Sequence, residues 1–279
     1  YMALQVTFLG TASGLPTPGR FGQTVVVGVK KADHDSPMYF VFDAGDGASS
    51  LLMRHGIDHL AIEAIFISHM HADHHGGLAQ VVKTSMHLQR SRPLCILAPG
   101  EGIAPLKAYL AASYLIDPFL KYEINWIPID EHVGWPIPLA GDAHLTAVAN
   151  THLNGYRRRL EQLSKQGSYR FESYSCALDI DSKRLVYTGN LRGASGHDEL
   201  VSFVEPCDLL ITELAHTDPA ELGRFLAGRD IAHTAIAHFN RKWDQLSDQE
   251  LLDLIHQGAG KTGISGHITL TRDGTVITL

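Results

Sequence analysis

The stretch that decides the fold is Ser68-His69-Met70-His71-Ala72-Asp73-His74-His75-Gly76-Gly77. Four histidines and one aspartate fall within seven residues, directly after the apolar run at 64–67. Imidazole and carboxylate groups are the ligands that zinc and similar divalent metals prefer. The alternation of His69 and His71 on an extended segment points both rings to one side, and Asp73 and His74 then turn in a different direction. The pattern predicts a metal site in which the second pair serves a second metal.

The bulk composition is that of an ordinary globular protein. Its 279 residues are 44% hydrophobic and 19% charged, enough for one large domain or two small ones. The 23 basic and 30 acidic residues give a net charge of −7, which argues against broad non-specific nucleic-acid binding. Three separated cysteines favour buried thiols in a reducing compartment. No run approaches the ~20 apolar residues of a membrane span. No signal-peptide pattern is found, so a cytoplasmic protein without a membrane partner is expected.

Strand patterns and helical patterns alternate along the chain. Strand-like segments are expected at 64–67, 145–149, 184–188, 209–212 and 234–237, among others. The chain is expected to end in a hairpin of residues 268–271 and 276–279 that turns at Asp273-Gly274. Many strands with interspersed helices predict two sheets flanked by helices, in a single domain over 1–279.

Further ligand candidates follow three of the later strands. His152 follows 145–149, Asn190 follows 184–188, and His238 follows 234–237. Rigid strand ends hold ligands well. Alone, either histidine could simply cap a strand. Their shared placement after strands, in a chain that carries the first cluster, favours metal binding.

The chain resembles the metallo-β-lactamase superfamily, and within it the ribonuclease Z-like branch. The run His69-x-His71-x-Asp73-His74 matches the superfamily signature. Blocks at 8–16, 42–47, 187–192 and 238–243 are similar to ribonuclease Z blocks. The resemblance implies an α/β (α+β) fold, a four-layer αβ/βα sandwich of two mixed sheets flanked by helices. It also implies a metal-dependent hydrolase in which Asp43, in the second block, is structural.

The same resemblance implies a ligand set for two divalent metals. One metal would be held by His69, His71 and His152, and the other by Asp73, His74 and His238. Zinc is the expected metal, with manganese or iron as alternatives. An aspartate normally bridges the two metals where this chain has Asn190. The missing carboxylate leaves an extra positive charge, so the second metal should be held more weakly. A working site with an amide ligand, a site with one tightly held metal and an inactive chain are all consistent with this change.

The expected chemistry is attack by a metal-activated hydroxide on a phosphorus or carbonyl centre. Asp73 can orient the attacking water. The leaving oxygen also needs a proton, and Glu213 and His216 are candidates because ribonuclease Z-like proteins carry a glutamate and a histidine for this transfer before the last metal ligand. Alternatively, His216 caps or packs on the helix expected at 219–227.

A basic insert lies at about 153–173, directly after His152. Five basic side chains, including Arg157, Arg158 and Arg159, oppose one acidic side chain over 153–170. Beside a metal ligand this pattern favours phosphate recognition, and Arg241 could add a contact. A solvated helical turn is the alternative. The insert is shorter than the arm with which ribonuclease Z grips tRNA, so tRNA is not the favoured substrate.

The favoured function is therefore a phosphodiesterase acting on a small or exposed phosphodiester. One alternative is a hydrolase of a carboxylic ester, lactone, β-lactam or sulfate ester. Another is a catalytically weakened binding protein, because Asn190 replaces the usual aspartate. Dimers are common among similar proteins, so a homodimer is one expected assembly.

Overall fold

The structure of the protein is a computed structural model, and it describes residues 3–30, 37–163 and 169–279. The chain folds as two compact units. Unit 1 comprises Tyr1–Glu131, Leu139–Asp142 and Thr271–Leu279, and unit 2 comprises His132–Pro138 and Ala143–Leu270. The single domain over 1–279 stays a prediction. Part of the basic insert, residues 164–168, lies outside the described residues.

The described part of unit 1 contains a seven-stranded mixed sheet. Its strands, in order across the sheet, are β14 (Thr275–Thr278), β1 (Ala3–Gly10), β2 (Thr24–Lys30), β3 (Met38–Phe42), β4 (Ile62–Phe66), β5 (Leu94–Ala98) and β6 (Ile124–Pro128). Pairing is antiparallel from β14 to β3 and parallel from β3 to β6. Four of the five β4 residues are buried, as expected of a parallel strand with a nearly continuous apolar sequence.

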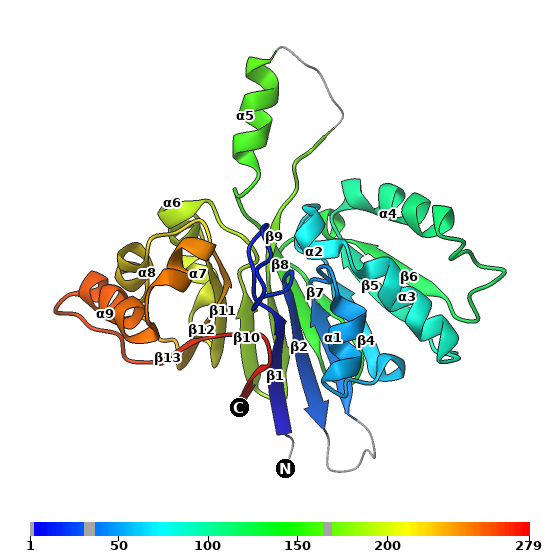
Figure 1. The fold of residues 1–279 in the computed structure, drawn as a ribbon, viewed down its shortest axis with the longest axis horizontal. Helices are drawn as coiled ribbons and strands as arrows, with labels where there is room; N and C mark the ends of the chain where they lie inside the picture. The colour runs from blue at the N-terminus through cyan, green and yellow to red at the C-terminus, as the bar shows by residue number, and fades with distance from the viewer. Residues whose placement is uncertain (1–2, 31–36, 164–168) are drawn as a thin grey trace. The chain divides into compact units, whose positions relative to one another are not determined.

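Helices cover one face of this sheet (Figure 1). They are α1 (Ala48–Arg54), α2 (Ala72–His75), α3 (Leu78–His87) and α4 (Gly100–Ala112), with short 3₁₀ helices η1 (His59–Ala61) and η2 (Ile129–Glu131). Leu51 of α1, Val82 of α3 and Leu110 of α4 belong to one buried cluster with Ile65 and Ile96 of the sheet. Burial of this apolar surface holds the helices on the strands and fixes the loops that follow β3 and β4.

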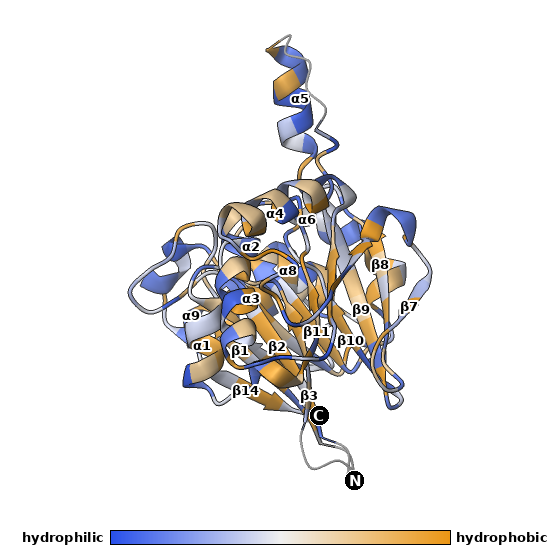
Figure 2. Ribbon diagram, turned by 90° about the vertical axis from the view of Figure 1, so that its right-hand side faces the viewer, coloured by the Kyte–Doolittle hydropathy of each residue, from blue (hydrophilic) through white to orange (hydrophobic). Residues whose placement is uncertain are grey.

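Unit 2 repeats the pattern with a second mixed sheet, seven-stranded over its described residues. The order is β13 (His267–Leu270), β12 (His233–Phe239), β11 (Leu209–Leu214), β10 (Lys183–Tyr187), β9 (Tyr174–Ile180), β8 (His144–Ala149) and β7 (Pro136–Pro138). Pairing is antiparallel from β7 to β10 and parallel from β10 to β13. Figure 2 shows the hydrophobic colouring of β9, β10 and β11.

The helices of unit 2 are α5 (Asn154–Gln162), α6 (Gly193–Glu199), α7 (Val201–Val204), α8 (Pro219–Leu226) and α9 (Asp248–Ala259), with the 3₁₀ helix η3 (Arg241–Gln245). Leu222 of α8 and Ile255 of α9 are buried in one cluster with Ile236 of β12. Helix α9 was not predicted, although its Ser247–Glu250 capping box is a recognisable start signal. The prediction of two mixed sheets flanked by helices is confirmed.

The predicted C-terminal hairpin is wrong. β13 pairs in parallel with β12 in unit 2, whereas β14 pairs in antiparallel fashion with β1 in unit 1. The Asp273 carboxylate, in the expected turn, accepts hydrogen bonds from the Thr11 and Phe21 amides at 2.9 and 2.6 Å. The turn is thus bound to the N-terminal loop of unit 1, and each strand joins a seven-stranded sheet, which is more stable than an isolated two-stranded hairpin.

Among residues 3–30, 37–163 and 169–279, no helix is both long enough and apolar enough to cross a membrane.

Candidate metal and catalytic site

The unit 1 part of the site follows the buried strand β4. His71 has extended backbone angles and stands directly before α2, which carries Asp73 and His74. The His69 Nε2 and His71 Nδ1 atoms are 2.9 Å apart, and their ring centroids are 4.6 Å apart. These two ring nitrogens face each other, as the alternation in the sequence predicts, and they form one pair of potential ligand atoms.

Asp73 and His74 form a second pair on α2. The His74 Nε2 atom lies 3.2 Å from the Asp73 Oδ2 atom. The His74 side chain is fully buried, and that of Asp73 is 15% exposed. The change from extended backbone at His71 to helix at Asp73 therefore produces two separate donor pairs from six consecutive residues.

A buried carboxylate, Asp43, holds this arrangement from behind. Asp43 lies just after β3 with a φ of 59°, a left-handed conformation that aspartate tolerates better than most residues. Its carboxylate accepts hydrogen bonds from the Ser68 amide and hydroxyl at 2.8 and 2.9 Å, and lies 2.6 Å from His74 Nδ1. With Nδ1 bound to Asp43, the Nε2 atom of His74 is turned toward Asp73. These contacts match the structural role expected of Asp43, whereas the residue pattern does not indicate Ser68.

The charge on His74 depends on these two carboxylates. Burial is the largest influence and lowers the pKa of His74, but Asp43 and Asp73 together outweigh it and raise the pKa to about 9. The protein without metal therefore keeps this ring protonated at neutral pH. A metal that binds Nε2 must displace that proton.

In unit 2, His152 lies beyond the end of β8. The His152 amide donates to Asn150 Oδ1 at 3.1 Å, and His152 Nδ1 lies 3.3 Å from the Leu191 carbonyl oxygen. A ring that donates from Nδ1 to a backbone carbonyl keeps its lone pair on Nε2, which is the arrangement found in histidines that bind metals.

Asn190 lies in the turn after β10, and its side chain is 3% exposed. Its buried Oδ1 atom has no hydrogen-bond partner among residues 3–30, 37–163 and 169–279. A buried amide oxygen without a partner costs free energy, so it is normally satisfied by an ion or water. Together with the imidazole and carboxylate donors, this orphaned oxygen fits a divalent metal.

His238 is placed by an irregularity in β12. The register between β11 and β12 shifts between Glu213 and Leu214, which pair with Ala237 and Phe239, so that His238 is the extra residue of a β-bulge. Its φ is +49°, an unusual value for a histidine within a strand. Bulges and left-handed residues redirect side chains and are enriched at functional sites.

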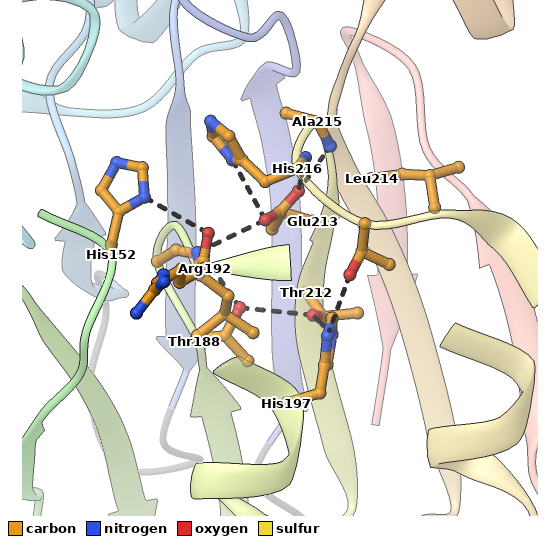
Figure 3. Close-up of polar contacts among 12 residues, drawn as sticks. His152, Thr188, Arg192, His197, Thr212, Glu213, Leu214, Ala215 and His216 are labelled. Atoms are coloured by element: carbon orange, nitrogen blue, oxygen red, sulfur yellow. Dashed lines mark hydrogen bonds and ion pairs between the residues drawn. The ribbon is translucent and has the colours of Figure 1, made fainter. Parts of the chain in front are cut away.

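Glu213, near the end of β11, forms a hydrogen-bonded pair with His216, which follows the strand (Figure 3). The buried Glu213 carboxylate accepts hydrogen bonds from the backbone amides of Leu191, Ala215 and His216, and its Oε1 atom lies 3.1 Å from His216 Nδ1. Burial, the largest influence, raises the pKa of Glu213, but these bonds and the charges of His216 and His238 lower it to about 2. The carboxylate is ionised and orients the half-exposed His216 ring.

Three imidazole rings of unit 2, those of His152, His216 and His238, lie close to one another. The His216 ring centroid is 4.8 Å from that of His152 and 6.2 Å from that of His238. The alternative in which His216 caps α8 is wrong, because Asp218 is the N-cap and forms a capping box with Glu221. Three residues far apart in the sequence are thus brought together by the ends of β8, β11 and β12.

The basic insert forms the exposed helix α5, in which no described side chain is buried. Figures 1 and 2 show α5 standing clear of the sheet strands β8 and β9 of its own unit. Arg157 donates to the Arg170 carbonyl oxygen at 2.6 Å and so ties the two limbs of the insert together. Arg158, Arg159 and Arg241 are exposed. The substrate contacts of these arginines stay a prediction.

Comparisons with known proteins agree with this geometry. A family model described as the beta-lactamase superfamily domain matches residues 39–256. The chain is 24% identical to the ribonuclease Z of Picrophilus torridus, over 87% of this chain and 88% of that protein. It is 34% identical to the ribonuclease Z of Staphylococcus aureus over 132 residues, which are 47% of this chain and 41% of that protein.

Solved structures share the fold. The metallo-beta-lactamase fold protein YhfI from Bacillus subtilis has a TM-score of 0.70 at 18% identity, over 99% of each chain. The short form of human tRNase Z has a TM-score of 0.68 at 20% identity, over 98% of each chain.

Proposed function

Because the chain belongs to the beta-lactamase superfamily and is a metal-dependent hydrolase, we propose that it is a ribonuclease Z-like phosphodiesterase. The observation that carries this proposal is the Glu213–His216 pair, whose imidazole ring lies 4.8 Å from that of the candidate ligand His152. A phosphodiester releases an alkoxide, which needs a proton as the bond breaks. A histidine held by a buried carboxylate beside a ligand is suited to deliver that proton.

The family and its fold imply bound divalent metal. We propose that His69, His71 and His152 would hold one metal and that Asp73, His74 and His238 would hold the other, with Asn190 offering a further oxygen ligand. Zinc fits this nitrogen-rich donor set, with manganese or iron as alternatives. The Asn190 amide would supply an oxygen ligand without a charge, so the second metal would be held more weakly than the first.

When bound, the metals would activate water as the nucleophile and offset negative charge in the transition state. The chain's own residues supply the rest. Asp73 accepts a hydrogen bond from the attacking water and orients it. Glu213 holds His216 through Nδ1, which leaves Nε2 to carry the proton that goes to the leaving oxygen. The same carboxylate stabilises the protonated ring before transfer.

Exposed arginines are suited to bind the flanking phosphates of the substrate. Arg158 and Arg159 on α5 and Arg241 on η3 are unburied guanidinium groups, which bind phosphate oxygens through two donors at once. The rings of Tyr156, on α5, and Phe171 are stacked with their centroids 6.3 Å apart. The ribonuclease Z relatives support a nucleic-acid phosphodiester. Because the insert is short, an exposed phosphodiester is favoured over tRNA.

The proposal is tested by metal content together with substrate comparison. The purified protein is loaded with zinc, its metal is counted by mass spectrometry, and hydrolysis of bis(p-nitrophenyl) phosphate is compared with that of a carboxylic ester, a lactone, a β-lactam and a sulfate ester. We expect metal-dependent turnover of the phosphodiester at the highest kcat/KM. Faster turnover of another ester or lactam would favour the alternative hydrolase, and metal binding without any turnover would favour a binding protein.

A cytoplasmic location and a homodimer stay predictions. Size-exclusion chromatography with light scattering measures the assembly state directly, and fractionation of cells followed by immunodetection measures the location.

A further inference from the structure

A buried histidine outside the proposed ligand set, His197, connects the segments that carry the reactive residues of unit 2. His197 lies on α6 and is 1% exposed. Its Nε2 atom is 3.0 Å from the Thr212 hydroxyl, and its Nδ1 atom is 3.5 Å from the Thr217 hydroxyl. The Thr212 hydroxyl is in turn 3.3 Å from that of Thr188 (Figure 3).

Each of these threonines is next to a residue of the proposed chemistry. Thr212 directly precedes Glu213, and Thr217 directly follows His216. Thr188 is followed by Gly189 and Asn190, and its hydroxyl also donates to the Gly189 carbonyl oxygen at 2.9 Å. One imidazole ring therefore ties together the backbone on both sides of the Glu213–His216 pair and the turn that carries Asn190.

The surroundings of His197 favour a neutral ring with fixed hydrogen bonds. Burial, the largest influence, lowers its pKa, and the attraction of Glu213 does not reverse the shift. Its ring centroid is 4.8 Å from that of Phe225 on α8, so one side of the ring is packed. A neutral imidazole offers one donor and one acceptor, which suits a link between hydroxyl groups.

We propose that His197 is a positioning residue that keeps the His216 ring oriented for proton transfer. It does so through its contacts with Thr212 and Thr217, which flank the 213–216 turn. This inference rests on the proposed proton transfer from His216. A displacement of the proton donor by about 1 Å can cost up to about 100-fold in rate. The loss should appear only where the leaving group needs a proton.

The experiment compares two phosphodiesters that differ in their leaving group. p-Nitrophenolate leaves without protonation, whereas a simple alkoxide does not. In the zinc-loaded protein, His197→Phe should lower kcat for the alkyl phosphodiester by about 10-fold and kcat for the p-nitrophenyl phosphodiester by less than about 2-fold. KM should stay unchanged for both. His197→Gln, which keeps a polar atom near Thr212, should recover part of the loss.

A double-variant cycle separates positioning from a general structural effect. In a His216→Ala background, His197→Phe should cause no further loss on the alkyl substrate, because the group that it aims is absent. His59→Phe is the matched control, since His59 is also fully buried and lies 3.2 Å from a hydroxyl, that of Ser49, in unit 1. This control should lower stability without changing the ratio of the two kcat values.

The tautomer of the His216 ring can be measured without turnover, from long-range ¹H–¹⁵N spectra of the histidine rings in the metal-free protein. His216 should hold its proton on Nδ1 in the wild type, and His197→Phe should give a mixture of tautomers. If His197→Phe does not fold, Thr212→Val and Thr217→Val remove the two hydroxyl contacts singly and should each give part of the same selective loss.

Two results would overturn the inference, and they are distinguishable. If His216→Ala is selective for the alkyl substrate but His197→Phe lowers both substrates equally or neither, His197 is only structural. If His216→Ala itself shows no selectivity, the proposed proton transfer is wrong, and the role of His197 is wrong with it.

Discussion

The candidate residues of unit 1 and those of unit 2 are arranged in opposite ways along the sequence. In unit 1 the four candidate ligands lie between His69 and His74, on one loop and one short helix. In unit 2 the corresponding residues are spread between His152 and His238, each at the end of a different strand. The first half is a local property of the sequence, whereas the second exists only because parallel strands end at the same edge of a sheet.

Both halves nevertheless use a buried carboxylate to orient a histidine. Asp43 lies 2.6 Å from His74 Nδ1, and Glu213 lies 3.1 Å from His216 Nδ1. His74 is a proposed metal ligand, whereas His216 is the proposed proton donor. The same device thus serves metal binding in unit 1 and proton transfer in unit 2.

The largest expected effect separates these two roles directly. His71→Ala removes a ligand, so it should lower both the zinc content and the hydrolysis of every phosphodiester, by at least about 10³-fold in rate. His216→Ala should keep the zinc content. Mass spectrometry of bound metal beside kinetics measures both, and His87→Ala, an exposed histidine of unit 1, is the control. Loss of metal in His216→Ala would remove the distinction between the halves.

The second test replaces the two buried carboxylates. Asp43→Asn should weaken metal affinity by about 10–100-fold, because groups that orient a ligand have effects of this size. Glu213→Gln should leave metal affinity unchanged and lower kcat for an alkyl phosphodiester, with less effect on a p-nitrophenyl ester. Zinc titration with a competing chelator gives the affinities. The comparison between the halves fails if the two variants show the same pattern.

The sequence predicts the unit 1 half well because its information is local. Alternation of His69 and His71, followed by a turn into a helix, is enough to place two donor pairs. The sequence also predicts His152 and His238 as ligands, but only through their position after strands. Their geometry depends on the Leu191 carbonyl and on a bulge with positive φ, and nothing in the residues around His238 encodes that bulge.

Contacts between residues far apart in the sequence explain the remaining differences between the predicted and the observed structure. The Asp273-Gly274 pair is an ordinary turn signal, yet Asp273 bonds to Thr11 and Phe21, some 250 residues earlier. The expected hairpin is therefore divided between two sheets. The sequence does not single out His197, because its threonine contacts come from β11 and the turn before α8.

A third variant, Asn190→Asp, places at position 190 the aspartate that is usual in the family. Asn190→Asp should tighten the second metal by at least about 10-fold, because it adds a negative charge beside the cations, and should raise kcat. Zinc titration and phosphodiester kinetics measure the two effects. Asn154→Asp adds the same charge on α5 and should change neither. If stoichiometry and rate are both unchanged in Asn190→Asp, position 190 does not bridge the metals.

The smallest expected effect is that of a substitution at Asp208. This residue lies at the ends of β10 and β11 that are opposite to the reactive residues of unit 2. Asp208 accepts from Lys183 Nζ at 2.7 Å and from the Arg184 amide at 2.9 Å, at the start of β10 and β11. Burial, the largest influence, raises its pKa, but these two donors outweigh it and lower the pKa below the ordinary 3.8. A lowered pKa means that the stabilisation is present above pH 3.8 and is lost as the pH falls through the lowered value.

Asp208→Asn should therefore lower the free energy of unfolding at pH 7 by less than about 1 kcal/mol, since the pair is partly exposed. The difference from the wild type should shrink when denaturant unfolding is repeated at lower pH, toward the lowered pKa of Asp208. Turnover at neutral pH should not change, because the reactive residues of unit 2 lie at the other ends of these strands. A loss of kcat in Asp208→Asn would mean that strand pairing at one end of the unit 2 sheet affects the geometry of the catalytic residues at the other end. Such long-range dependence is not expected of the unit 1 ligands, because they are contiguous in the sequence.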